Sequence, residues 1–465
     1  MTEQEKDSRS LVYSLEGKPP IGTAIVLGMQ HVLAMFVGNL TPLLVVGGAY
    51  AGANPGSIDV AYLCQCAMVM AGIMTLVQLY RVGPIGSGLP IVMGTSSAFL
   101  GVNSFVASNF GWAALMGAGL VGGLFEMFIG SIIKHIRKVF PPLVTGVTVL
   151  SIGITLLPVG VQSMAGGGKP GINPNFGSLQ NLAIASFVVL AIILLKTFGK
   201  GLANLASMLI AMIIGYMISL IMYLAIPPEL QTFNFTLKNF MDNGLFSFPV
   251  PFKYGIEFHA GAIIPMLFMF IVTAIETIGD STGVAQGALN RDLTDQELRG
   301  TILADGFSSF FASIFNVSPL TSFSQNVGLV RMTKVVNRFT IATGAAFLIL
   351  AGIFRPIGEF FSTIPPAVLG GAVIGMFGSI AVSGIGMLQK EKLNGRNTLI
   401  VALALGIGVG FGQGAGLAAG AMAHFPTWLQ YIFGGNGIAA ATIIAMVLNL
   451  LLPQEKEEDQ VKAIV

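Results

Sequence analysis

The chain has 465 residues, of which 54% are hydrophobic and only 9% are charged, and its net charge is +2. An ordinary soluble domain carries roughly 25% charged residues. The composition therefore excludes a water-soluble protein, and the weak charge bias gives no sign of nucleic acid as a partner.

Apolar stretches of about 20 residues, the length that crosses a bilayer, recur from end to end. Bounded by charged residues, Pro or Gly, they predict an all-α polytopic membrane protein with about fourteen spans. We expect one membrane domain at residues 21–453, between cytoplasmic tails at 1–20 and 454–465. The predicted spans lie near residues 21–47, 59–80, 90–107, 111–133, 141–160, 178–195, 202–226, 258–286, 299–316, 319–331, 337–353, 364–385, 398–420 and 428–452.

The basic residues support this topology. With both termini in the cytoplasm, the inner segments hold 19 of the 23 Lys and Arg residues, and only Lys169, Lys238, Lys253 and Arg355 fall outside. An excess of positive charge on the inner side is typical of membrane proteins. We therefore place the protein in the cell inner membrane.

The cysteines and the first residues exclude some other roles. Cys64 and Cys66 lie two residues apart in an apolar run, a spacing that disfavours a disulfide and lacks further ligands for a metal. We expect packing residues there, and neither a metal nor another cofactor. The first 18 residues are too polar for a cleaved signal.

Two predicted spans contain residues that disfavour a simple helix. Residues 89–102 (LPIVMGTSSAFLGV) and 318–330 (SPLTSFSQNVGLV) combine Pro, Gly and hydroxyl side chains. Irregular backbone at membrane depth must line a protein cavity, because lipid cannot satisfy its polar groups. The two segments are third in each half of seven spans, which predicts inverted repeats, approximately 21–226 and 256–453, with a site between them. The alternative is that Gly and Ser only permit close helix packing.

Glu276, Asp280 and Asp305 are carboxylates inside predicted spans. Glu276 and Asp280 lie four residues apart on one helical face, and no Lys or Arg occurs between Lys253 and Arg291 to neutralise them. Asp305 lies in the next span. Because an unpaired charge at membrane depth is costly, we interpret these residues as a proton-accepting group. A capping or packing role is the alternative for Asp305.

The tenth span supplies polar side chains for a binding site. Gln325 and Asn326 follow the break at Pro319, where the start of a half-helix would present free N–H groups. The Gln325 amide can donate and accept in one plane, and Glu276 can accept from ring N–H groups. The pattern favours a planar heterocycle with alternating N–H and C=O groups.

Two other titratable residues are ambiguous. His31 follows Gln30 in the first span, where a lone histidine is more often a packing residue. Glu126 lies about two turns before Lys134, so we interpret it as reaching toward the inner interface, outside the site.

The run Gln325 to Lys334, QNVGLVRMTK, resembles the signature of the nucleobase-ascorbate transporters: Gln or Glu, Asn, any residue, Gly, four residues, then Thr and a basic residue. The Gln30–His31 pair, the segment around Glu276 and the LADG sequence around Asp305 occur in that family's order. The resemblance covers essentially the whole chain.

The resemblance implies two inverted repeats of seven spans, a core domain that moves against a gate domain, and short antiparallel strands in spans 3 and 10. It also implies a homodimer. By this resemblance Glu276 and Gln325 hold the base, Asp305 and His31 support the site, and Asn326 tunes affinity or coupling.

Other positions bear on the identity of the cargo. Ser97 stands where many relatives have an aromatic residue, so a stacking face is lost there unless Phe99 or Phe323 replaces it. We expect Ser97, Phe323 and Ser324 to contact the base. Gln at position 325 resembles the purine branch, and the sequence ETIGD, which retains Asp280, is more similar to xanthine carriers than to urate carriers.

The expected function is uptake of a purine base, with xanthine as the expected cargo, by proton symport and elevator-like alternating access. Urate, another oxopurine or uracil is the alternative cargo. An anion transporter of similar architecture would need a basic residue at the site. An intramembrane enzyme would need a nucleophile, metal or phosphate motif, and none accompanies these residues.

Overall fold

The computed structural model describes residues 11–136, 141–168, 173–233, 235, 244–413, 424–426, 430 and 437–453. The predicted C-terminal tail, half of the N-terminal tail and parts of the last two predicted spans lie outside these residues. The described elements run in the order η1 (Leu11–Tyr13), α2 (Ile21–Pro42), η2 (Leu43–Gly47), α3 (Gly48–Ala53), α4 (Val60–Tyr80), β1 (Met93–Thr95), η3 (Ser97–Phe99), α5 (Leu100–Phe110), α6 (Trp112–Ile136), α7 (Pro142–Met164), α8 (Leu179–Phe198), α9 (Leu202–Leu205), α10 (Ser207–Ala225), η5 (Pro228–Leu230), α11 (Ala260–Ala288), α12 (Asp295–Ile314), β2 (Leu320–Ser322), α13 (Ser324–Thr333), α14 (Arg338–Ile353), α15 (Arg355–Ser362), α16 (Pro366–Leu388), α17 (Gly395–Gln413) and α20 (Gly437–Leu451).

Helices dominate the fold, as the long apolar runs predict. Among the described residues, eight helices are long and apolar enough to cross a membrane, and three shorter apolar helices accompany them in α14, α17 and α20. The prediction of a mostly helical, multi-pass membrane protein is confirmed.

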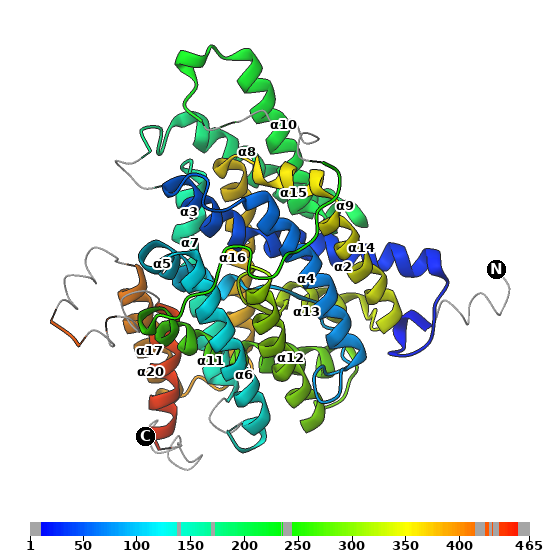
Figure 1. Ribbon diagram of the computed structural model, residues 1–465. Helices are drawn as coiled ribbons and strands as arrows, with labels where there is room; N and C mark the ends of the chain where they lie inside the picture. Colours follow the sequence, from blue (N-terminus) through cyan, green and yellow to red (C-terminus); the bar gives the residue numbers. More distant parts are fainter. Residues whose placement is uncertain are drawn as a thin grey trace.

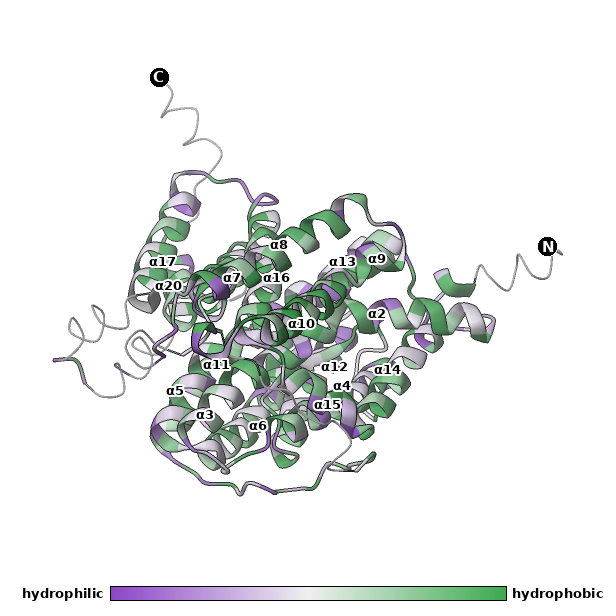
Figure 2. Cartoon of the chain, turned by 90° about the horizontal axis from the view of Figure 1, so that it is seen from above, coloured by the Kyte–Doolittle hydropathy of each residue, from purple (hydrophilic) through white to green (hydrophobic). Residues whose placement is uncertain are grey.

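Apolar side chains cover the outer faces of several helices. On α8 the exposed residues include Phe187 and Ile193, and on α10 they include Met217 and Leu224. Figure 2 shows that both helices are coloured mostly as hydrophobic. Such faces suit contact with lipid, because burial against hydrocarbon removes the cost of exposing them to water.

Two short strands lie inside this helical body. β1 and β2 pair antiparallel, with Met93 opposite Ser322 and Thr95 opposite Leu320, and all six strand residues are buried. They belong to the two interrupted segments that the sequence singles out, which are more than 200 residues apart along the chain. Each strand leads toward a helix that starts in the interior, β1 through η3 into α5 and β2 into α13.

Side chains from neighbouring helices satisfy the backbone of these strands. The amide of Thr95 donates to Asn39 Oδ1 at 2.9 Å, and the amide of Met93 donates to Thr75 Oγ1 at 3.0 Å. On β2, Ser309 Oγ accepts from the Leu320 amide at 3.1 Å and contacts its carbonyl oxygen at 2.8 Å. These partners pair the edges of the strands, because unpaired backbone groups in the apolar interior would be costly.

Close helix contacts hold the strands in place. α6 packs extensively on α12 and α4 packs on α14, while α7 packs on α16 in a neighbouring part of the molecule (Figure 1). The α6–α12 contact is backbone to backbone: a Cβ atom on Gly306 would lie 2.6 Å from the carbonyl oxygen of Gly123. Only glycine permits this separation.

We predict that Gly306→Ala destabilises the protein by about 1–3 kcal/mol, because the added methyl group forces α6 and α12 apart. Thermal unfolding of the purified protein in detergent measures the effect. Gly406→Ala is the matched control, since a Cβ there meets no atom within 4 Å. Equal unfolding temperatures for the two variants would contradict the close contact.

Candidate functional site

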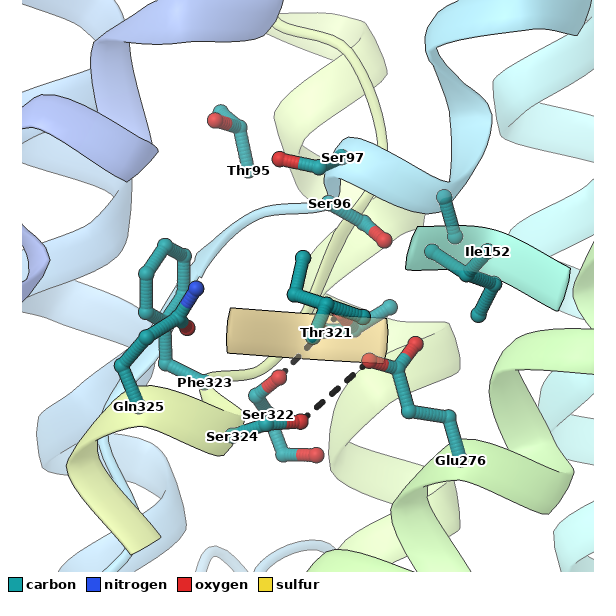
Figure 3. Close-up of a pocket in the computed structure, with 12 residues that line it drawn as sticks. Thr95, Ser96, Ser97, Ile152, Glu276, Thr321, Ser322, Phe323, Ser324 and Gln325 are labelled. Atoms are coloured by element: carbon teal, nitrogen blue, oxygen red, sulfur yellow. Dashed lines mark hydrogen bonds between the residues drawn. The ribbon is translucent and has the colours of Figure 1, made fainter. Parts of the chain in front are cut away.

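A polar pocket lies where β1, β2 and the start of α13 meet α11. Its volume is about 330 Å³, counted with the open space at its mouth. The lining combines hydroxyl groups, one carboxylate, one amide and a few apolar side chains (Figure 3). The lining residues are Thr95, Ser96, Ser97, Ala98, Ile152, Glu276, Thr321, Ser322, Phe323, Ser324, Gln325 and Ile380.

All five predicted base-contacting residues line this one pocket. Glu276 comes from α11, Ser324 and Gln325 from the first turn of α13, Phe323 from the residue before it, and Ser97 from η3. In Figure 3 the Glu276 carboxylate points toward Ser324, and Gln325 lies on the opposite side of the pocket. Tertiary folding thus brings together segments that are distant in sequence.

Phe323 supplies the aromatic side chain of the pocket. Its ring is buried against two glycines: a Cβ on Gly38 or on Gly94 would lie 2.8 Å from a Phe323 ring carbon. Phe99, the other candidate for stacking, is fully buried against Phe270, with ring centroids 4.8 Å apart, and it is absent from the pocket lining. Of the two aromatic residues, Phe323 can face a ligand.

Hydroxyl groups connect the pocket carboxylate to a second one. Ser324 Oγ lies 3.3 Å from Glu276 Oε1 and 3.0 Å from Asp280 Oδ2. Ser322 Oγ donates to the same oxygen of Asp280 at 2.8 Å. Asp280 itself is buried behind the lining, one helical turn along α11 from Glu276.

Thr277 extends the hydrogen-bond network to Asp305 on α12. Its hydroxyl is hydrogen-bonded to Asp305 Oδ2 and lies 3.2 Å from Ser322 Oγ. Asp305 is fully buried in the middle of its helix, so the alternative of a helix cap does not hold. Every salt bridge found among the described residues lies elsewhere, which leaves these three carboxylates without a cation.

His31 and Asn326 form a separate pair. The Asn326 Nδ2 atom donates to the His31 carbonyl oxygen at 2.9 Å and lies 3.3 Å from His31 Nδ1. Both residues are buried and neither lines the pocket. Their contact joins α2 to α13 at the residue after Gln325. The pair can therefore position α13, and neither side chain reaches the pocket.

Sequence reasoning missed several residues of the site. Thr277 and Ser322 lie inside the segments that it singled out, and their hydroxyl groups were the available signal. Ile152 of α7 and Ile380 of α16 line the pocket from helices in which the sequence indicated no site residue. Isoleucine in an apolar span is indistinguishable from a packing residue by sequence.

The interpretation of Glu126 as an interfacial residue was wrong. Its side chain is fully buried, and Thr273 Oγ1 of α11 donates to its Oε1 at 3.0 Å. Lys134 instead lies 3.7 Å from Asp295, with both side chains largely exposed.

Within the part of the chain that the structure describes, no group of three His, Cys, Asp or Glu residues could hold a metal ion.

Solved structures share this fold. The transmembrane domain of the cyanobacterial bicarbonate transporter BicA aligns with a TM-score of 0.58 at 14% identity, covering 93% of this chain and 98% of that one. The murine anion transporter Slc26a9, in an inward-facing state, aligns with a TM-score of 0.61 at 12% identity, covering 96% of this chain and 70% of that one. The matches define a multi-pass protein with the fold of membrane transporter domains.

Sequence relatives identify the family within this class. Residues 22–415 match the permease family Xan_ur_permease, and the chain belongs to it. The xanthine permease XanP of Escherichia coli (strain K12) is 34% identical, over 97% of both chains. The nucleobase transporter PlUacP of Paenibacillus larvae is 34% identical, over 94% of this chain and 96% of that protein. The resemblance to nucleobase-ascorbate transporters is confirmed.

We predict that Thr277→Val lowers the free energy of unfolding by about 1–3 kcal/mol, because it leaves the buried Asp305 carboxyl without its hydroxyl partner. Thr277→Ser keeps the hydroxyl and is the control. Thermal unfolding in detergent compares the two variants. A valine variant as stable as the serine variant would show that the contact contributes nothing.

Proposed function

We propose that this protein carries a purine base into the cell together with protons, and that xanthine is its cargo. The observation that carries the proposal is the pocket itself, in which Glu276 and Gln325 face one space beside serine hydroxyls. Relatives named as xanthine permeases match over nearly the whole chain and support the choice of cargo.

The lining suits a flat, polar ring. Glu276 can accept hydrogen bonds from ring N–H groups, and the Gln325 amide can pair with an adjacent N–H and C=O. Phe323 offers an aromatic face, while Ile152 and Ile380 add apolar contact from two other helices. A binding site of this kind combines apolar walls with a few convergent polar groups.

A shortage of hydrogens supports proton binding at the site. Five contacts link Thr277, Ser322 and Ser324 to one another and to the three carboxylates. Each hydroxyl carries one hydrogen, so three hydrogens serve five contacts. The other two contacts need hydrogens from carboxylic acids. If Glu276 and Asp305 each carry a proton, every one of the five contacts has one hydrogen. Asp280 is then the ionised carboxylate of the three, and it accepts hydrogen bonds from Ser322 and Ser324.

The fourteen-span architecture is part of the proposal. The eight long spans and three shorter apolar helices leave three further crossings, at β1 with α5, at α12, and at β2 with α13. Packing also follows the proposed repeats, 21–226 and 256–453. Exchanging the two repeats replaces each span by the span seven positions away in the other repeat. Under this exchange the α4–α14 contact corresponds to α12–α6, α2–α14 corresponds to α11–α6, and α8–α16 corresponds to α17–α7. All of these pairs are in contact.

Elevator-like movement fits the two groups of helices. The proposed core consists of α2, α4, α11 and α12, which contact the paired strands, and of α6 and α14, which pack on those helices. The proposed gate consists of α7, α8, α10, α16, α17 and α20. Most of the lining belongs to the core, whereas Ile152 and Ile380 belong to α7 and α16 of the gate. A sliding core would carry the base past these two side chains.

The location, orientation and oligomeric state of the protein are also part of the proposal. We propose an inner-membrane protein with both termini in the cytoplasm, which functions as a homodimer and needs no cofactor besides the coupled proton. Two predicted outer residues support the orientation, since Arg355 lies 3.2 Å from Asp59 and the Lys253 ammonium lies over the Tyr62 ring. Both contacts lie at the start of α4, so they place these two predicted outer charges near one end of that helix.

The rival classes receive less support. The structural neighbours include a bicarbonate transporter, but none of the described residues that line the pocket is Lys or Arg, the residues that a small-anion site would use. An intramembrane enzyme would return a chemically altered base. Competition of labelled xanthine uptake by unlabelled urate, uracil and other oxopurines separates the alternative cargoes.

We predict that Glu276→Gln and Gln325→Ala each lower xanthine uptake by more than about 30-fold, because each removes a polar partner of the base worth about 2 kcal/mol or more. Uptake of labelled xanthine in cells lacking their own carriers measures this, with membrane content checked by immunoblot. The exposed Glu229→Gln change is the control. Robust uptake by either pocket variant would refute the site.

We predict that an inward proton gradient drives xanthine accumulation in proteoliposomes. One proton carried with each base supports about tenfold accumulation for each pH unit, since one unit is worth about 1.4 kcal/mol. A protonophore should abolish the accumulation. Uptake that ignores both the gradient and the protonophore would exclude proton symport.

A further inference from the structure

One buried carboxylate has no role in the binding and coupling proposed above. Glu126 of α6 is fully buried, and its Oε1 accepts a hydrogen bond from Thr273 of α11 at 3.0 Å. Its other oxygen, Oε2, is buried without a hydrogen-bond partner among the described residues. An acidic side chain held in this way in an apolar interior carries a large cost unless it binds a proton or interacts with another group.

The threonines of α11 place Glu126 beside Asp305. Thr273 contacts Glu126, and Thr277, one helical turn later, contacts Asp305. Side chains four residues apart on a helix face the same way and stand about 5–6 Å apart. The glycine contact between α6 and α12 brings the two backbones together at the same level. The Oδ1 atom of Asp305 is also buried without a partner in the described part of the chain.

Among the described residues, the helix segments around Glu126 offer no cation. α6 packs against α5, α11 and α12. α5 has no titratable residue, and the middle of α11 and α12 contributes only Glu276, Asp280 and Asp305. Asp305 and Glu276 both act electrostatically on Glu126. Two ionised carboxylates side by side in this environment would repel each other strongly, so at least one of the pair must hold a proton.

We propose that Glu126 and Asp305 share a proton behind the base pocket, and that Glu126 is a second proton-holding residue of the transport cycle. The proton leaves the carboxylic acid of Asp305 and adds to the carboxylate of Glu126, or the reverse, and the charge of the pair is unchanged. This places a proton acceptor on α6, beyond the network that ends at Asp305. The inference rests on the proposed proton coupling.

The test compares two kinds of xanthine transport in proteoliposomes. Exchange of internal for external xanthine at equal pH requires binding and movement but no net proton transfer, whereas accumulation driven by a proton gradient requires coupling. Glu126→Gln should keep exchange within about twofold of the unaltered protein. It should lower gradient-driven accumulation about tenfold at one pH unit, the loss expected for one proton, and should flatten the pH profile.

Two variants control for structure. Glu257→Gln makes the same chemical change at an exposed carboxylate and should leave exchange and accumulation unchanged. Glu126→Asp keeps a titratable group on a shorter side chain and should retain most of the gradient-driven accumulation. Accumulation and pH profile unchanged in Glu126→Gln, or equal losses in the Gln and Asp variants, would overturn the shared proton.

Two further outcomes remain decisive. If Glu126→Gln fails to insert, Thr273→Val tests the same site by removing the hydroxyl donor of Glu126. The midpoint of the pH profile of gradient-driven accumulation should then move by about half a unit. An unmoved midpoint would overturn the proposal. If the unaltered protein itself ignores the proton gradient, proton coupling fails as a whole. A gradient-responsive protein with an unaffected Glu126→Gln variant refutes only the role of Glu126.

Discussion

The interior of this protein depends on satisfying polar backbone in a place that water does not reach. β1 and β2 interrupt two membrane segments, and their N–H and C=O groups would be costly if left facing hydrocarbon. They pair with each other, and Asn39, Thr75 and Ser309 supply partners from three surrounding helices. Because the strands are held in this way, α13 can begin in the middle of the protein and present its first residues to a pocket.

The carboxylates follow the same physical rule with a different solution. Glu276, Asp280 and Asp305 have hydroxyl partners in place of cations. A salt bridge would fix each carboxylate in its charged form, whereas a hydroxyl can donate to a carboxylate or accept from a carboxylic acid. The network is therefore compatible with more than one protonation state. The proposed binding and release of protons during transport would require this property.

Glycine determines how closely the supporting helices approach. The contact of Gly123 with Gly306 joins α6 to α12, and Gly38 and Gly94 leave room for the ring of Phe323. Gly306 follows Asp305 on α12, and Phe323 lines the pocket, so these close contacts lie at the site. α7 and α16 of the proposed gate line the pocket only through Ile152 and Ile380, so their proposed movement past the pocket would leave no polar lining group of these helices unpaired.

The amino-acid sequence by itself determined the membrane class and the two interrupted segments, and it indicated five of the twelve residues that line the pocket. These features depend on local chemistry: apolar length, Pro and Gly breaks, and carboxylates without neighbouring cations leave a signal in consecutive residues. Only the tertiary structure decided which side chains meet across helices. Ile152 and Ile380 look like any apolar residues, His31 pairs with Asn326 apart from the carboxylates, and Glu126 turns toward Thr273 instead of the interface. The rotation of a helix about its axis depends on what packs against it, and a single span does not encode that partner.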